Sequence, residues 1–291
     1  MEPLLCKGDV VALISCSDGI KQKNSKMVDD IIEVMIAMGL QVRLASTVFK
    51  KESTFISTGE NRAKELMNLF NDNQVKVIFD VSGGDEANQI LPFLDFEAIK
   101  TKAKPYFGHS DLSVILNSLY SQSGIYSYHY NIRNLIREFS KEQEEYFKSS
   151  FFEGEDDIYN FDYNFLRGES IEGEVIGGNL RCFLKLAGTK YLPDPDGKIL
   201  FLESLGGGIS RATSYFEQLI QMGYLERLSG ILLGTFTQVE KDDYTEELYS
   251  YLLRRTEELD IPMVVTEELG HGSASKCIVV GRTLTLERLV D

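Results

Sequence analysis

The sequence lacks several features that often assign a chain to a functional class. It has no tryptophan, three histidines and four cysteines in 291 residues. The cysteines show no CxxC spacing, so the sequence indicates neither a zinc cluster nor a disulfide framework. Neither GxGxxG nor GxxxxGK[ST] occurs, so no glycine-rich phosphate loop is predicted. We therefore expect reduced thiols, most of them buried.

An excess of basic residues and long apolar runs are also missing. The formal net charge is -15, from 45 acidic and 30 basic residues, which gives no support for a nucleic-acid partner. This balance does not exclude a local basic pocket. No apolar run approaches the roughly 20 residues of a spanning helix, and the polar start does not resemble a signal peptide. We expect a cytoplasmic protein with no membrane partner.

Strand and helix patterns alternate along the first half of the chain. Apolar runs typical of buried strands occur at residues 9–14, 41–45 and 75–79, and helical spacing occurs at 27–39 and 60–70. Strand patterns recur in the second half at 172–180, 198–203, 230–233 and 262–265, with helices near 215–222 and 246–253. This alternation predicts an α/β fold in both halves, with a parallel sheet covered by helices in the first.

An acidic stretch separates the two halves. Residues 140–162 carry many Glu and Asp residues between Phe and Tyr, which is typical of a solvated helix followed by a loop. We predict an N-terminal domain over residues 1–140, a connection over 141–168 and a C-terminal domain over 169–291.

Ser110 follows a short apolar strand and a glycine. Gly108 permits a tight turn, and Ser110-Asp111 then opens the apolar-periodic segment 112–119. A serine at such a turn presents its hydroxyl beside free amides at a helix start, which suits an oxyanion. The alternative is that Ser110 only caps the helix.

Two further stretches stand where α/β proteins bind ligands. Gly83-Gly84 follows the third strand, where a glycine lets a backbone amide approach a substrate closely; an ordinary turn is the alternative. His271 lies between two glycines after an apolar strand, which exposes its imidazole.

Ser110, Glu203 and His271 have the residue types and chain order of a Ser-acid-His triad. A serine hydroxyl needs a base, and the base needs a carboxylate that fixes its tautomer. The GxSxG signature is absent, because Leu112 stands in place of the last glycine. Glu267, Glu268 and Asp111 compete with Glu203 as the acid. His129 is interpreted as a structural or pocket-wall residue, and His109 is disfavoured as the base.

Five ordered stretches resemble motifs of the serine LD-carboxypeptidase family, which includes muramoyl-tetrapeptide carboxypeptidases and microcin C immunity peptidases. They are GGDEANQILPFLD (83–95), GHSDL (108–112), VIGGNL (175–180), ILFLE (199–203) and GHG (270–272). The resemblance implies an N-terminal flavodoxin-like domain with a parallel sheet and a smaller C-terminal domain of mixed α/β structure. It also implies a homodimer and no metal or organic cofactor.

The resemblance implies roles for particular residues. Ser110 would be the nucleophile, Glu203 the carboxylate and His271 the base, with the backbone amides of Gly84 and Asp111 binding the oxyanion. The expected substrate is a small peptide or peptide conjugate. The first hypothesis is hydrolysis of the L-to-D bond that releases D-Ala from muropeptides during cell-wall recycling.

Two alternatives stay open. One is immunity-type hydrolysis of an aminoacyl-nucleotide conjugate, and the other is a ligand-binding relative that does not use the triad. His109 and the run Tyr128-His129-Tyr130 depart from the usual family pattern, which leaves substrate preference open. Asp85 and Arg211 are candidate substrate-binding residues. Arg181 and Arg133 are further candidates for binding the substrate carboxylate.

Overall fold

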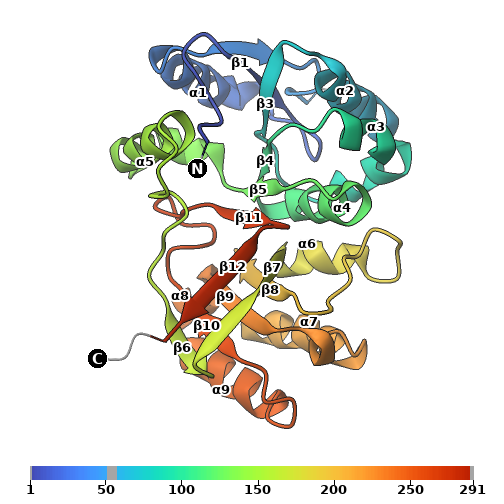
Figure 1. Cartoon of the computed structure of the whole chain (residues 1–291), viewed down its shortest axis with the longest axis vertical. Coiled ribbons are helices and arrows are strands. Elements are labelled where there is room, and N and C mark those ends of the chain that lie inside the picture. The colour runs from blue at the N-terminus through green and yellow to red at the C-terminus, as the bar shows by residue number, and fades with distance from the viewer. Residues whose placement is uncertain (1, 51–57, 289–291) are drawn as a thin grey trace.

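The computed structural model describes residues 2–50 and 58–288 and contains two six-stranded sheets. The first sheet has the order β11-β5-β4-β3-β1-β2 (Figure 1). Strands β1 to β5 are parallel and follow the flavodoxin-like order 2-1-3-4-5, whereas β11 is antiparallel to β5. The strands are β1 (Val10–Ile14), β2 (Gln41–Leu44), β3 (Val75–Asp80), β4 (Tyr106–Gly108), β5 (Ser127–His129) and β11 (Ile278–Val280).

Helices cover both faces of this sheet. In Figure 1, α1 and α5 lie on one side, and α2, α3 and α4 lie on the other. Their bounds are α1 (Ser25–Ala37), α2 (Gly59–Asn71), α3 (Phe96–Thr101), α4 (Ser113–Ser123) and α5 (Ser140–Phe152). Short 3₁₀ helices are η1 (Gln22–Asn24), η2 (Ala87–Phe93), η3 (Ser110–Leu112) and η4 (Ile132–Ile136). Coverage on both faces explains why β3 is buried at every residue except Lys76.

The second sheet is mixed, with the order β12-β7-β8-β9-β10-β6. Strands β7 to β10 are parallel, and the edge strands β12 and β6 are antiparallel to their neighbours. Its strands are β6 (Asn164–Arg167), β7 (Ser170–Asn179), β8 (Ile199–Ser204), β9 (Gly230–Phe236), β10 (Met263–Val265) and β12 (Thr283–Glu287). The predicted α/β fold is therefore confirmed, with a second sheet that is mixed and a first sheet whose parallel strands β1 to β5 are extended by the antiparallel edge strand β11.

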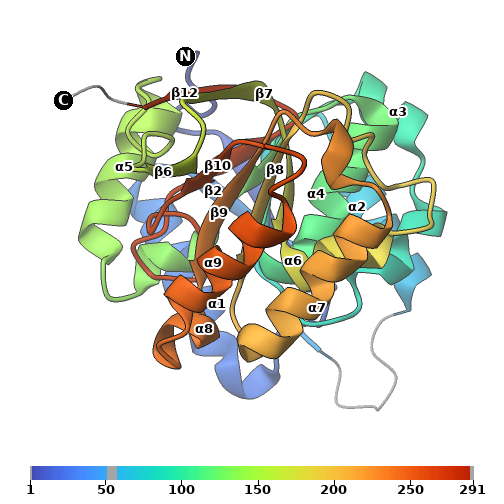
Figure 2. The same ribbon diagram turned by 90° about the horizontal axis from the view of Figure 1, so that it is seen from below.

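Helices of the second half pack beside β8 and β9 (Figure 2). They are α6 (Leu180–Phe183), α7 (Gly208–Gln221), α8 (Thr237–Lys241) and α9 (Thr245–Arg255), with 3₁₀ helices η5 (Leu184–Leu186) and η6 (Leu225–Arg227). No helix within the two described ranges is long and apolar enough to cross a membrane.

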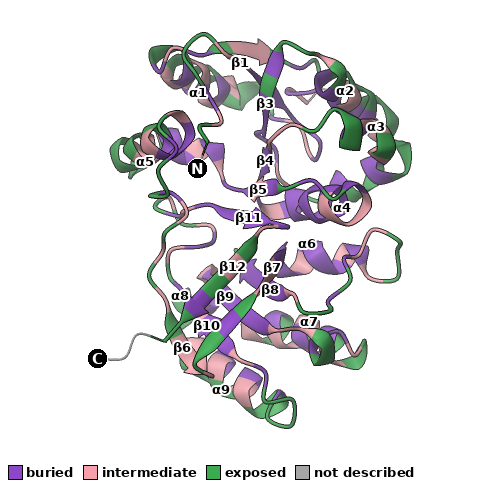
Figure 3. Cartoon of the chain, in the orientation of Figure 1, coloured by how far each residue is buried: buried purple, intermediate pink, exposed green. Residues whose placement is uncertain are grey.

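The main core runs through both halves, and a second, smaller core lies in the second half. Phe147 and Phe151 of α5 pack in the first half, where Phe147 lies 6.0 Å from Phe79 and Phe151 lies 5.1 Å from Phe107 between ring centroids. Strand β11 returns from the C-terminal segment to the first sheet, and Figure 3 shows it buried beside β5. The segment 141–168 thus holds α5 and β6 as well as a loop. The domain limits stay a prediction, and the outer ones, residues 1 and 291, lie outside the described residues.

Candidate active site

Ser110 sits in a strained turn directly after β4. Its φ of 60° lies in the left-handed region, which non-glycine residues rarely adopt. Gly108 lets the turn close, because a Cβ there would lie 2.8 Å from the Cβ of Leu112. Within the described residues no side chain caps η3 or α4, so the helix-cap alternative lacks its hydrogen bond. The turn therefore presents the Ser110 hydroxyl to the cavity that it lines.

Glu203 and His271 form a hydrogen-bonded pair. The distance from Nδ1 of His271 to Oε2 of Glu203 is 2.5 Å, and Glu203 is completely buried in β8. The other carboxylate oxygen, Oε1, accepts a 3.1 Å hydrogen bond from Nδ2 of Asn179. Nε2 of His271 is buried and has no partner among the described residues. This arrangement leaves Nε2 as the nitrogen that can exchange a proton with a bound molecule.

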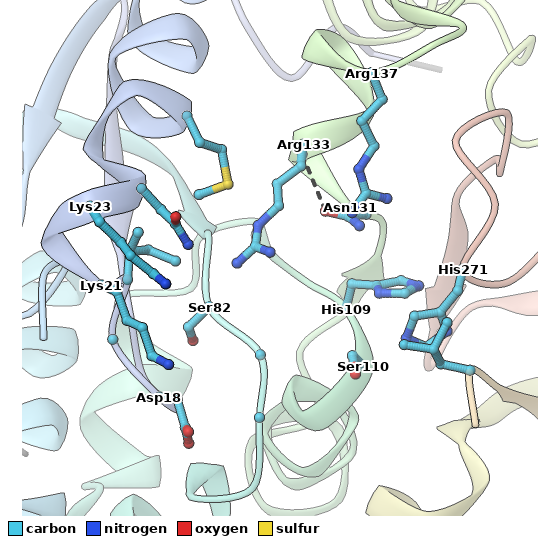
Figure 4. Close-up of a pocket in the computed structure, with 17 residues that line it drawn as sticks. Asp18, Lys21, Lys23, Ser82, His109, Ser110, Asn131, Arg133, Arg137 and His271 are labelled. Carbon is cyan, nitrogen blue, oxygen red and sulfur yellow. Dashed lines mark hydrogen bonds between the residues drawn. The ribbon is translucent and has the colours of Figure 1, made fainter. Parts of the chain in front are cut away.

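One cavity brings the candidate residues together. Ser110, His109 and His271 line a cavity of about 560 Å³, together with Gly83 and Gly84 (Figure 4). The loops after β1 and β3 form its wall, at the carboxyl ends of strands where the strand order reverses. Ser113 links this turn to the second half, because its Oγ donates to the Ser110 carbonyl (2.7 Å) and accepts from the Asn179 amide (2.9 Å).

His109 and His129 complete a cluster of the chain's three histidines. Nε2 of His109 lies 2.9 Å from the Gly270 carbonyl, and its ring centroid lies 4.3 Å from that of His271. Burial lowers the pKa of His109 well below 6.5, and burial lowers the pKa of His129 to about 4. Both rings are therefore neutral at pH 7. His109 supports the loop that carries His271.

Among the described residues, one group of side chains is close enough together to bind a metal ion. Ligand atoms of His109, His129 and Glu203 lie within 4.8 Å of one another, and Nε2 of His129 lies 3.9 Å from Oε1 of Glu203. The carboxylate already bonds His271 and Asn179, so an ion here would compete with these hydrogen bonds.

The buried histidines predict an acid-sensitive fold. Because the pKa of His129 is lower in the folded chain than in the unfolded chain, the unfolded state binds more protons between pH 6.5 and 4. Stability should fall as pH drops through this window, by roughly 3 kcal/mol from this residue. Urea unfolding of wild type and His129→Gln at pH 7 and pH 5 measures the effect. Equal pH dependence in both proteins would contradict it.

A buried carboxylate that the sequence interpretation missed shapes the glycine loop. Asp80, the last residue of β3, accepts hydrogen bonds from the backbone amides of Cys16 and Ser82, each at 2.9 Å. It thereby joins the loops after β1 and β3. A buried strand that ends on Asp is the signal that could have identified it. Beyond it, Gly84 has a φ of 129°, and a Cβ there would lie 2.4 Å from Cγ of Asp18.

The competing acids are engaged elsewhere. The Asp111 carboxylate is buried and accepts from Ser17 Oγ at 2.6 Å and the Ala87 amide at 2.9 Å, besides pairing with Lys185. Glu268 accepts from the Asp162 amide at 2.9 Å. Glu267 is exposed. Among the described residues the carboxylate that bonds His271 is that of Glu203.

The candidate substrate-binding residues divide into two groups. Asp85 forms an ion pair with Arg181, and neither residue lines the cavity, nor does Arg211 of α7. Arg133 does line it, and its Nε donates to the Val81 carbonyl at 3.0 Å. The sequence interpretation missed three other basic lining residues, namely Lys21, Lys23 and Arg137. These residues come from two separate segments that line the same cavity only in the folded chain, so no local motif identifies them.

Comparisons with known proteins identify the family. Residues 11–130 match the LD-carboxypeptidase N-terminal domain, and residues 172–286 match the LD-carboxypeptidase C-terminal domain. The murein tetrapeptide carboxypeptidase of Pseudomonas aeruginosa is 26% identical over 90% of each chain. The microcin C7 self-immunity protein MccF of Escherichia coli is 23% identical, over 84% of this chain and 81% of its own.

A solved structure of MccF in complex with aspartyl sulfamoyl adenosine has the same fold. It is 21% identical, with a TM-score of 0.86 over 97% of this chain and 94% of its own. Together with the two family matches, this fold agrees with the family that the five motifs resemble. The chain belongs to the LD-carboxypeptidase family and is a serine peptidase.

Proposed function

We propose that this peptidase hydrolyses the L-to-D peptide bond of muropeptides through Ser110, His271 and Glu203, and so releases a terminal D-Ala for cell-wall recycling. The observation that carries the proposal is the Glu203–His271 hydrogen bond, with Nε2 of His271, which has no partner among the described residues, beside the cavity of Ser110. We also propose that the enzyme works as a homodimer.

The first half-reaction forms an acyl-enzyme. Nε2 of His271 takes the Ser110 proton as Oγ attacks the scissile carbonyl carbon. The imidazolium then gives this proton to the leaving amine as the C–N bond breaks, which frees D-Ala. The Glu203 carboxylate holds Nδ1–H toward itself and stabilises the positive charge. In the second half-reaction Nε2 of His271 takes a proton from water as the water oxygen attacks the acyl carbon. The imidazolium then returns this proton to Oγ of Ser110 as the ester C–O bond breaks, which releases the shortened peptide.

Two backbone amides are proposed to bind the oxyanion. Gly84 follows β3, and Asp111 follows Ser110 in η3 after β4, so both lie at the carboxyl ends of neighbouring strands. Amides fixed before the reaction stabilise the developing negative charge without reorganisation. The contacts of the Asp111 side chain with Ser17 and Ala87 hold this turn in place.

Arg133 is the proposed partner of the substrate's terminal carboxylate. It lines the cavity with Ser110, whereas Arg181 is paired with Asp85 and Arg211 lies elsewhere. Arg133 forms no ion pair with a carboxylate in the described ranges. A charge-assisted hydrogen bond from its partly buried guanidinium to the substrate carboxylate would therefore strengthen substrate binding.

The cavity lining favours a peptide over a nucleotide conjugate. Apart from the two histidines, the described residues around the cavity include no aromatic side chain that could stack a nucleobase. The relative MccF has been solved with aspartyl sulfamoyl adenosine, so hydrolysis of such a conjugate is the second candidate.

Turnover of two substrates tests this proposal. We expect the protein to release D-Ala from an L-Ala-D-Glu-diamino acid-D-Ala tetrapeptide, and to hydrolyse aspartyl sulfamoyl adenosine at least 100-fold more slowly in kcat/KM. Arg133→Gln should raise KM for the tetrapeptide about tenfold or more, because a charged hydrogen bond is lost. Liquid chromatography with mass detection follows both products. Faster turnover of the adenosine conjugate would favour the second candidate.

A further inference from the structure

The far end of the catalytic cavity carries positive charge that the proposed reaction does not use. Lys21 and Lys23 lie in the loop after β1, at the end of the cavity away from His271 (Figure 4). Arg133 of η4 and Arg137, which directly follows η4, come from the opposite wall. Four cations therefore line this cavity, two of them at its far end, in a chain whose formal net charge is -15.

These cations lack matching acids. Asp18 is the one carboxylate among the described lining residues, and none of the four cations forms an ion pair within the described ranges. The positive charges of Arg133 and Arg137 repel each other, and an anion that enters the cavity relieves this repulsion. Burial, followed by the charge of Arg137, lowers the pKa of Arg133, and the charge of Asp80 offsets this only in part.

One terminal carboxylate does not neutralise this cavity. If Arg133 binds that group near Ser110, Lys21 and Lys23 still line the opposite end, where Asp18 is the one carboxylate among the described lining residues. We propose that Lys21 and Lys23 form a second anion site, which binds another free carboxylate of an acidic peptide substrate. This inference rests on the proposed function and adds that the enzyme selects substrates with two separated carboxylates.

A carboxylate on a peptide fits better than a nucleotide phosphate. Lysine serves either anion as a point charge. However, the described lining residues next to the two lysines are Asp18, Gly19, Ile20, Asn24 and Met27, and they supply no aromatic platform for a base. Ile20 and Met27 can instead contact the aliphatic part of an acidic side chain.

Matched peptides test the second site. Two tetrapeptides ending in D-Ala would differ only in one internal side chain, a free carboxylate or its carboxamide. We expect wild type to prefer the carboxylate about tenfold in kcat/KM. The Lys21→Gln/Lys23→Gln variant should reduce this ratio to nearly one. Lys26→Gln is the matched control, because Lys26 is exposed, pairs with Asp30 at 2.7 Å and does not line the cavity.

Binding separates this inference from the proposed function. Calorimetric Kd values for both peptides on Ser110→Ala should show the same preference and the same loss on replacing the lysines. If wild type hydrolyses neither peptide but this binding preference holds, the second site stands and the proposed reaction fails. The second site would be overturned if the lysine double variant kept the preference for the carboxylate peptide. It would also be overturned if Ser110→Ala bound neither peptide, or bound both equally, with or without the lysine replacements. Lysine dependence confined to aspartyl sulfamoyl adenosine would overturn it as well.

Discussion

Ser110→Ala is expected to lower kcat on the tetrapeptide on the order of 10⁴-fold or more, because the attacking oxygen is removed. The protein should remain folded. Ser110 lies at a turn rather than in the core, and alanine and serine carry similar strain at a φ of 60°. Steady-state kinetics and far-ultraviolet circular dichroism measure the two effects.

Ser110→Gly is the matched control for backbone strain. It also lacks the hydroxyl and should be equally inactive, yet glycine tolerates positive φ, so its unfolding free energy should exceed that of Ser110→Ala by about 1 kcal/mol. Activity of Ser110→Ala within tenfold of wild type would show that another group is the nucleophile.

Glu203→Gln is expected to lower kcat roughly 10² to 10⁴-fold with little change in KM. The amide is nearly the same size as the carboxylate, but it is neutral and can present a donor to Nδ1 of His271, which favours the wrong tautomer. It also removes the negative charge that stabilises the imidazolium. Because Glu203 is completely buried, water cannot replace that charge.

Glu268→Gln is the matched control for this carboxylate. Glu268 is near His271 in the sequence, but it bonds the Asp162 amide and Lys276. Its replacement should leave kcat within about twofold of wild type. Wild-type kcat in Glu203→Gln together with a large loss in Glu268→Gln would move the acid role to Glu268.

Much of the fold follows from local patterns in the sequence. The apolar runs at 75–79 and 198–203 correspond to β3 and β8, because parallel strands covered on both faces need continuous apolar residues. Strands β6, β11 and β12 were not predicted. The three residues of β11 have too few neighbours to show a period, and their position depends on pairing with β5, about 150 residues earlier.

The candidate site could be predicted only where the chain carries a local signal. Turn glycines mark the positions of Ser110 and His271, and a strand end marks Glu203. No local signal marks Lys21 and Lys23 as cavity residues, because they line the cavity only when the loop after β1 lies opposite η4. The same is true of the choice of Arg133 over Arg211, which only tertiary structure distinguishes.

Covalent labelling tests the role of Ser110 most directly. The protein would be treated with a fluorophosphonate, which phosphonylates activated serines, and the adduct located by peptide mass mapping. The proposed mechanism predicts one adduct per chain, on Ser110, with loss of peptidase activity in proportion to labelling and much slower labelling in Glu203→Gln. Complete inactivation with the adduct on a different residue, or full labelling of Ser110 with activity retained, would contradict it.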